Sequence, residues 1–399
     1  MLARFTRIRY CDPSPMAVER HVSARTVRAL LILAAFVVRI VVAFASPLPW
    51  FSADSYGYLN QARDLIAGRW TPFFPVGYPV IIAAVAAVVP SPPTPALIAL
   101  NVVLSTITVW LVMKTADAAT PWHWAPVAAG AIIAFWPNQL NYVRFVLSEV
   151  PAAFFVAASA ALLIKGRHYA AGATLGCAVA IRTTLLPAIF VAPFVVAFRS
   201  RNRAASFTAG SVSPLLVLAL VSILLTGSIA LGGNLGFNLD VARQSFGSRI
   251  DFSGPTDVGV REAAARYVKD AIDQPRHFLA QRAASLSELW GPWPSGDEPR
   301  ARSSPPRGAL ARVLIGLRLP LLVLGLLSIR RSMPLHERYL WVLVAVVTLV
   351  HVMTFSAPRF TFVVEPALIV LAMLGVERTW VRWCERRDSN PHTLAGTRS

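Results

Sequence analysis

The chain has 399 residues, of which 55% are hydrophobic and 15% are charged, and its formal net charge is +18 at pH 7. A water-soluble domain cannot bury so large an apolar fraction, so the composition excludes an ordinary soluble protein and indicates a multispanning membrane protein. The basic residues stand in short clusters between apolar runs. That pattern disfavours a nucleic-acid interface and is typical of segments that orient a protein in an anionic bilayer.

Apolar runs long enough to be membrane spans recur along most of the chain. The first run has no small-residue cleavage site after it, so we expect a retained span and not a removed signal peptide. Several runs are shorter than the roughly 20 residues that cross a bilayer unaided. The sequence nevertheless predicts an all-α integral membrane bundle of about ten transmembrane helices, at residues 29–45, 96–113, 123–137, 150–164, 168–181, 183–198, 205–226, 313–329, 339–356 and 360–376.

One further apolar run, "VIIAAVAAVV" at 80–89, lies between Pro79 and Pro90. As a helix it reaches only about 15 Å, half the hydrocarbon thickness. If this run does not cross, the short basic loops fall on the same side as residues 1–28, which carry six arginines. If it crosses, those loops fall on the opposite side, against the positive-inside rule. We therefore expect a re-entrant or surface-lying helix here, and both termini in the cytoplasm of a multi-pass plasma-membrane protein.

This topology divides the chain into five parts. A cytoplasmic basic N-terminus (1–28) precedes an N-terminal transmembrane module (29–226), an extracytoplasmic loop (227–311), C-terminal transmembrane helices (312–376) and a cytoplasmic tail (377–399). In the loop, helical spacing predicts two short helices over 258–290, restarted at Pro275. The Gly/Asn-rich stretch 232–240 is read as turn-like, and the Pro/Gly-rich stretch 291–308 as mobile.

Ionisable residues gather in the segments that this topology places outside the membrane. Asp54 follows the first span, Glu149 begins the fourth span, and Arg182 and Arg359 lie at the tips "IRTT" and "SAPRF". A guanidinium can bind a lipid phosphate through two parallel hydrogen bonds, and a carboxylate can take a proton from a hydroxyl nucleophile. Together they imply transfer from a lipid-phosphate donor to an acceptor outside the cell. The transmembrane module 29–226 would then be the catalytic one.

Each of these residues also has a structural explanation. Asp54 is a favoured N-cap residue for the helix that follows it. Glu149 stands at the start of a span, where an acid complements the helix dipole. The charge of Arg182, like that of Arg359, is alternatively the mark of a turn between two spans.

Three charged residues lie within predicted spans, where an unpaired charge is costly. We expect Arg39 and Glu365 to pair with each other or with outer-loop groups, with snorkelling of Arg39 to the outer surface as an alternative. Arg318 is expected to snorkel outward. His351 has no metal-ligand partner at a useful spacing and is read as structural.

Four stretches, taken in order, resemble the GT-C glycosyltransferases. They are "ADSYGYLNQARDLIAGRWTPFFPVGYP" after the first span, "FWPNQLNYVRFVLSE", "GATLGCAVAIRTTLLP" with its arginine between two short helices, and "PRFTFVVEPALIVLA" as the last span. The outer-loop stretch "YVKDAIDQPRHFLAQRAASLSELWGPW" is similar as well. The nearest branch looks like the bacterial relatives of protein O-mannosyltransferases and lipid A aminoarabinose transferases.

The resemblance implies an inverting membrane glycosyltransferase that transfers a hexose or pentose from a polyprenyl-phosphate donor to an acceptor hydroxyl on a glycan, lipid or protein, with no nucleic-acid partner. Asp54 would be the general base, and arginines such as Arg182 or Arg359 would hold the phosphate. Glu149 matches a second outer-loop acid of the group and would orient the acceptor.

Tyr58 and Arg144, from the same outward segments, are assigned to substrate binding. Many relatives have a second acid directly after the first, where this chain has Ser55. A divalent metal is therefore possible but not indicated.

Two other classes of function stay open. A lipid-linked sugar flippase or another transporter would place charges near the bilayer midplane, and Arg39 and Glu365 are the residues that favour it. A non-catalytic membrane scaffold would use only its outer loop for binding. The polar tail "RRDSNPHTLAGTRS" is assigned no function.

Overall fold

A computed structural model describes residues 23–44, 51, 53–70, 72–89, 92–227, 229, 232–246, 257–291 and 317–388. These residues are largely helical, and none of them lies in a β-strand. Five helices are long and apolar enough to cross a membrane, and shorter apolar helices accompany them. The predicted all-α fold class is confirmed.

The long apolar helices are α1 (Ala24–Phe44), α4 (Thr94–Ala119), α10 (Arg201–Thr226), α16 (Leu335–Met353) and α17 (Glu365–Asp388), which follows the 3-10 helix η2 (Pro358–Val364). The shorter apolar ones are α3 (Gly77–Val88), α5 (Ala125–Phe135), α7 (Glu149–Ile164), α8 (His168–Ile181) and α9 (Leu186–Ala197), which follows η1 (Thr183–Leu185). The remaining helices are α2 (Ala53–Ile66), α6 (Pro137–Tyr142), α11 (Leu235–Gln244), α12 (Val260–Asp273), α13 (Pro275–Trp290) and α15 (Arg318–Leu326). The last helix, α17, ends at Asp388, past the predicted end at residue 376.

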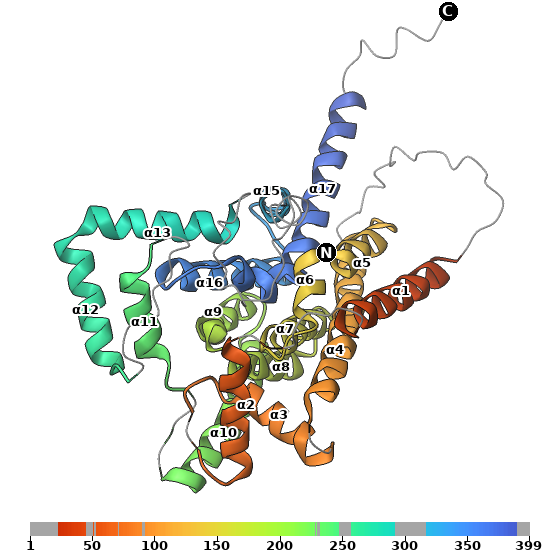
Figure 1. Ribbon diagram of the computed structural model, residues 1–399. Coiled ribbons are helices and arrows are strands. Elements are labelled where there is room, and N and C mark those ends of the chain that lie inside the picture. The colour runs from red at the N-terminus through yellow and green to blue at the C-terminus, as the bar shows by residue number, and fades with distance from the viewer. Residues whose placement is uncertain are drawn as a thin grey trace, which may run out of the picture.

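Helices α7 and α8 lie side by side at the centre of the bundle, and α10 packs closely on α8 (Figure 1). The close approach depends on glycines. A Cβ atom at Gly172 would lie 2.0 Å from the Phe207 carbonyl oxygen, and one at Gly176 would lie 2.3 Å from that of Ser211. Gly172 and Gly176 are four residues apart and share one face of α8, the small-residue pattern that lets two membrane helices approach to backbone contact.

The first loop is fixed by a side chain of α2. The Gln61 amide donates to the Phe74 carbonyl and accepts from the Phe74 backbone N–H, both at 2.9 Å. The Phe74 ring covers Gly57, where a Cβ would lie 2.2 Å from a ring carbon. These contacts fold the loop between α2 and α3 back onto α2 and hold the N-terminal end of that helix in place.

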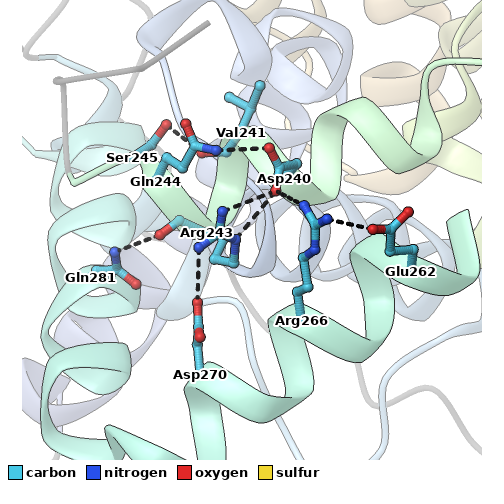
Figure 2. Close-up of polar contacts among 9 residues, drawn as sticks. All are labelled: Asp240, Val241, Arg243, Gln244, Ser245, Glu262, Arg266, Asp270 and Gln281. Atoms are coloured by element: carbon cyan, nitrogen blue, oxygen red, sulfur yellow. Dashed lines mark hydrogen bonds and ion pairs between the residues drawn. The ribbon is translucent and has the colours of Figure 1, made fainter. Parts of the chain in front are cut away.

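Helices α11, α12 and α13 form an arm at one side of the bundle (Figure 1). A polar cluster, drawn in Figure 2, joins them around the buried carboxylate of Asp240. That carboxylate pairs with Arg243 at 3.2 Å, accepts a hydrogen bond from Gln244 at 2.7 Å, and lies 3.9 Å from Arg266 of α12. The two helices predicted over 258–290 are confirmed as α12 and α13.

The turn-like reading of 232–240 is wrong, because Leu235–Gln244 is helical. Tertiary packing overrides the weak helix propensity of its glycine and asparagine residues. Gly236 lies directly against the Val258 carbonyl, where a Cβ would approach to 2.1 Å, and Val241 and Ala242 are buried. The predictions for residues 1–22, for 292–308 and for 389–399 fall outside the described residues.

Candidate functional site

The first of two ion pairs joins α2 to the segment before α17. Asp54 lies in the first turn of α2, inside the helix and not at its cap position. Its Oδ2 atom lies 3.0 Å from Nη2 of Arg359, which belongs to η2. Both side chains are partly exposed, at 35% and 17%. The carboxylate is therefore accessible, and it faces a cation from the far end of the chain.

The second ion pair joins the ends of α7 and α8. Glu149 is the first residue of α7, so its charge also complements the dipole of that helix. Arg182 directly follows α8, and its Nη1 atom lies 3.0 Å from Oε1 of Glu149. Both residues are buried.

Phe360 connects the two pairs. Its ring centroid lies 5.4 Å from the guanidinium carbon of Arg182 and 5.1 Å from that of Arg359, both within the range of a cation–π contact. His351 of α16 stacks on the same ring, with a centroid distance of 4.2 Å and an interplanar angle of 5°. One aromatic ring thus places two guanidinium groups near each other, where the charges of Asp54 and Glu149 offset their repulsion.

Tyr58 reaches the second pair through a serine. Its ring is buried between Phe74 and Tyr78, and its hydroxyl donates to Ser148 Oγ at 3.2 Å. Arg182 lies 3.4 Å from the same oxygen. Burial raises the pKa of Tyr58, and the nearby carboxylates of Glu149 and Asp54 raise it further. The phenol therefore stays neutral and keeps its proton as a hydrogen-bond donor.

Arg144, the other residue assigned to substrate binding, is buried in the segment between α6 and α7. Its guanidinium lies over the Phe145 ring at 4.7 Å. The structure therefore brings Asp54, Glu149, Arg182 and Arg359 together, with Tyr58 attached through Ser148.

Several buried polar atoms around the second pair have no hydrogen-bond partner among the described residues. They are Oε2 of Glu149, Nε of Arg182, Nε2 of His351 and the hydroxyl of Tyr78. Buried polar groups are almost always satisfied by protein or water. Open positions on an acid, an arginine and a histidine within one cluster therefore offer both donors and acceptors to a bound molecule.

The predicted pairing of Arg39 with Glu365, and the alternative of Arg39 snorkelling outward, are wrong. Arg39 is fully buried and donates to Ser105 Oγ at 2.7 Å and to the Ala134 carbonyl at 3.0 Å. Backbone carbonyls at the end of α5 lack intrahelical donors, so they attract the guanidinium.

For Glu365, the other predicted alternative is confirmed, because its partners lie in the predicted outward segment 138–149. It accepts from Asn138 at 2.7 Å and from Gln139 at 2.8 Å. Arg318, expected to snorkel outward, is also buried, and it donates to the Leu289 carbonyl at 3.0 Å. Protein partners thus satisfy Arg39 and Arg318, for which the sequence alone suggested the surface of the bilayer.

Arg282 on α13 is a residue that sequence reasoning did not single out. Its buried guanidinium donates to the carbonyls of Met353 and Thr354 at 2.8 Å and to that of Ala242 at 2.9 Å. It thereby caps the C-terminal end of α16 and ties it to α11. The chain reaches Arg359 five residues after Thr354, so Arg282 anchors the segment that carries the site.

The residues present do not resemble a metal centre built from neighbouring carboxylates. The described part of the chain has no group of three or more His, Cys, Asp or Glu residues close enough to hold a metal. Asp54 and Glu149 each face an arginine, and Ser55 takes the place of a second acid.

Comparisons with family models and with curated proteins find no match. Among solved structures, the chain is similar to the oligosaccharyltransferase AglB from Archaeoglobus fulgidus, both in complex with an inhibitory peptide and a dolichol-phosphate and in the apo form. In each case the TM-score is 0.52 and the identity 14%, over 93% of this chain and 52% of AglB. The chain spans about half the length of that protein, and the likeness is one of fold.

Proposed function

We propose that the chain is an inverting glycosyltransferase that moves a sugar from a polyprenyl-phosphate donor to a hydroxyl group of an extracytoplasmic acceptor. Asp54 is the general base, and Arg182 and Arg359 hold the donor phosphate. Within the GT-C fold, the sequence motifs favour the bacterial branch related to protein O-mannosyltransferases and lipid A aminoarabinose transferases.

The observation that carries this proposal is the meeting of two carboxylates and two arginines from four separate segments. Asp54 and Arg359 are 305 residues apart in sequence, yet they form an ion pair beside the pair of Glu149 and Arg182. Guanidinium groups suit a phosphate that gains charge as it departs, because they stabilise it through charge-assisted hydrogen bonds. A partly exposed carboxylate suits proton removal from an alcohol.

The proposed reaction is a single displacement at the anomeric carbon. The acceptor oxygen attacks that carbon from the side opposite the phosphate, and its proton passes to the Asp54 carboxylate. The bond between the anomeric carbon and the phosphate oxygen breaks, and polyprenyl phosphate leaves with the electron pair. Arg182 and Arg359 neutralise the charge that develops on it, while Glu149 orients the acceptor.

The hydrogen bonds of the intramembrane charges favour this enzyme over the flippase alternative. A transport path needs charged groups that can meet a passing substrate. Arg39 and Glu365, which favoured that alternative, are occupied by local serine, carbonyl and amide partners.

The proposed orientation puts the ion pairs outside the membrane and both termini inside. Helix α7 runs from Glu149 to Ile164, a length of about 24 Å. The ion pairs at its start and the basic residues Lys165 and Arg167 after its end therefore lie at opposite faces. By the positive-inside rule, the end with Lys165 and Arg167 is cytoplasmic.

A panel of donors tests the proposal. The purified protein, in vesicles with an envelope extract as acceptor, is incubated with polyprenyl phosphates that carry radiolabelled hexoses or pentoses. We expect one donor to lose its label to the acceptor with release of polyprenyl phosphate. Movement of an intact labelled lipid across the bilayer, with no sugar released, would instead identify a flippase.

A further inference from the structure

Two adjoining cavities lie at the end of α7 and α8 that is remote from the ion pairs. Helix α8 begins at His168 and ends just before Arg182, so it joins this region to the candidate site. The cavities have volumes of about 340 and 350 Å³ and share Arg199, Pro334 and Leu335 in their linings. They form between the connections α7–α8, α9–α10 and α15–α16, which are far apart in sequence.

The lining of the two cavities is basic. Its described residues include Arg199, Arg203 and Arg338, two histidines and no acid. Within the ranges that the structure describes, Arg199 and Arg203 have no acidic partner within 4.0 Å, and the guanidinium of Arg338 lies over the Phe198 ring. Glu337 lies between the lining residues His336 and Arg338, but its carboxylate pairs with Arg378 and with Arg330 at 3.7 Å, so it does not neutralise Arg199 or Arg203.

Polar groups around the second cavity also lack partners. Nδ1 of His168 and Nε2 of His336 are buried, with no hydrogen-bond partner in the described part of the chain. Helices α8, α10 and α16 all begin beside the cavities, at His168, Arg201 and Leu335. Free backbone N–H groups and the positive ends of helix dipoles favour an anion at such a place. Arginines, imidazoles and helix N-termini together match a phosphate group.

The apolar side of the first cavity indicates that the phosphate belongs to a lipid. Val195 and Phe198 of the α9 segment line that cavity. Phe190, Phe194 and Phe198 are 66%, 72% and 78% exposed, so this face of α9 is available to acyl chains. A headgroup in the cavity can therefore continue directly into hydrocarbon along α9. A free anion would not use this apolar wall.

We propose that these cavities bind the phosphate headgroup of an anionic membrane lipid, at the face opposite the ion pairs. Basic pockets between membrane helices are suited to such headgroups. This proposal needs only a multi-pass membrane protein and does not depend on the proposed sugar transfer. The alternative is that these basic residues only orient the chain in the membrane, which would not require them to line a common cavity. The two explanations predict different effects of replacing the lining arginines.

The test uses two double variants that remove equal charge from the same face. Arg199→Gln/Arg203→Gln alters the lining, whereas Arg25→Gln/Lys114→Gln alters exposed bases of α1 and α4 that line neither cavity. The full-length protein is delipidated in detergent and titrated with palmitoyl-oleoyl phosphatidylglycerol or the corresponding phosphatidylcholine, and bound lipid is counted by native mass spectrometry. We expect the wild-type protein to bind phosphatidylglycerol in preference to phosphatidylcholine. The affinity for phosphatidylglycerol should fall roughly tenfold in the lining variant. In the control variant it should stay within twofold of the wild-type value.

Three outcomes would overturn the proposal. The first is an equal loss of phosphatidylglycerol binding in both double variants, and the second is unchanged binding in the lining variant. The third is displacement of phosphatidylglycerol by an excess of inorganic phosphate, which would identify a site for free anions. Should the lining variant not give a monodisperse protein, Arg199→Lys/Arg203→Lys keeps the charge, and it should retain most of the binding. Loss of binding in that folded lysine variant to the level of phosphatidylcholine would also contradict the proposal.

Discussion

The guanidinium of Arg359 lies 3.0 Å from the carboxylate of Asp54. The arginine that is proposed to bind the donor phosphate is therefore paired with the proposed general base before the donor binds. A donor phosphate would compete with Asp54 for the same N–H groups. As Arg359 turns to the phosphate, the carboxylate is released toward the acceptor hydroxyl. On this account, donor binding prepares the base, and the donor binds before the acceptor.

Replacing Arg359 tests its proposed role toward the phosphate. Hydrogen bonds to charged groups contribute about 1.5–3 kcal/mol, so we expect Arg359→Gln to raise the donor KM by roughly 10- to 100-fold. Arg359→Lys keeps the charge and should recover part of the loss. Initial rates at varied donor concentration measure the effect. A donor KM that stays at the wild-type value in Arg359→Gln would remove Arg359 from the phosphate site.

The buried pair of Glu149 and Arg182 should be costly to break on one side only. Arg182→Gln leaves the Glu149 carboxylate buried without its cation, which we expect to lower the free energy of unfolding by about 3–5 kcal/mol. Thermal unfolding of the detergent-purified protein measures this loss. The double variant Glu149→Gln/Arg182→Gln should be more stable than Arg182→Gln, because no unpaired charge remains. Additive losses in the double variant would show that the two groups are not coupled.

Arg182 should also affect the two substrates unequally. If it holds the donor phosphate, Arg182→Ala weakens donor binding more than acceptor binding. Titrations of each substrate against the folded variant compare the two. Equal weakening of both would argue for a general loss of structure at the site.

Arg282 is expected to position the segment with Arg359 without touching substrate. Its guanidinium caps α16 through the carbonyls of Met353 and Thr354. Arg282→Gln should therefore lower kcat by about tenfold or more, since a misplacement of about 1 Å can cost 100-fold. Arg276→Gln, an exposed arginine on the same helix, is the matched control. A variant of Arg282 that loses stability but keeps wild-type kcat and KM would show a purely structural role.

Gly172 should resist even the smallest enlargement. A methyl group there would meet the Phe207 carbonyl oxygen at 2.0 Å, a backbone atom that cannot rotate away. We expect Gly172→Ala to force α8 and α10 apart and to cost roughly 1–3 kcal/mol of stability, measured by thermal unfolding. An unchanged midpoint of thermal unfolding would mean that α8 and α10 can move apart without a loss of stability, which would contradict this prediction.

Much of the candidate site could be anticipated from the sequence because the charges are few. Only 15% of the residues are charged, so an acid or an arginine between two apolar runs stands out as a candidate for a functional role. Counting basic loops by the positive-inside rule then groups these candidates on one face of the membrane. Asp54, Glu149, Arg182 and Arg359 were found in this way. The actual pairing of Asp54 with Arg359 depends on how α2 packs against η2, which no local pattern encodes.

Other features had weaker signals or none. Gly172 and Gly176 stand four residues apart in "GATLG", a spacing that already indicates close helix packing. By contrast, Arg39 and Arg318 are satisfied by distant backbone carbonyls, so hydropathy alone assigned them the wrong surroundings. Helix α11 was missed because its composition favours turns, while its burial against the segment at Val258 stabilises a helix.

The most direct test of the account is sugar transfer by Asp54→Asn compared with Asp64→Asn. Asp64 lies on the same helix and pairs with Arg69 away from the site, so its variant controls for the loss of a charge on α2. We predict that Asp54→Asn lowers transfer from a radiolabelled polyprenyl-phosphate sugar by at least about 100-fold, the scale of general-base catalysis, while the folded variant still binds the donor. Asp64→Asn should keep near-wild-type transfer. Turnover by Asp54→Asn equal to that of the wild type, at matched protein amounts, would contradict the central claim.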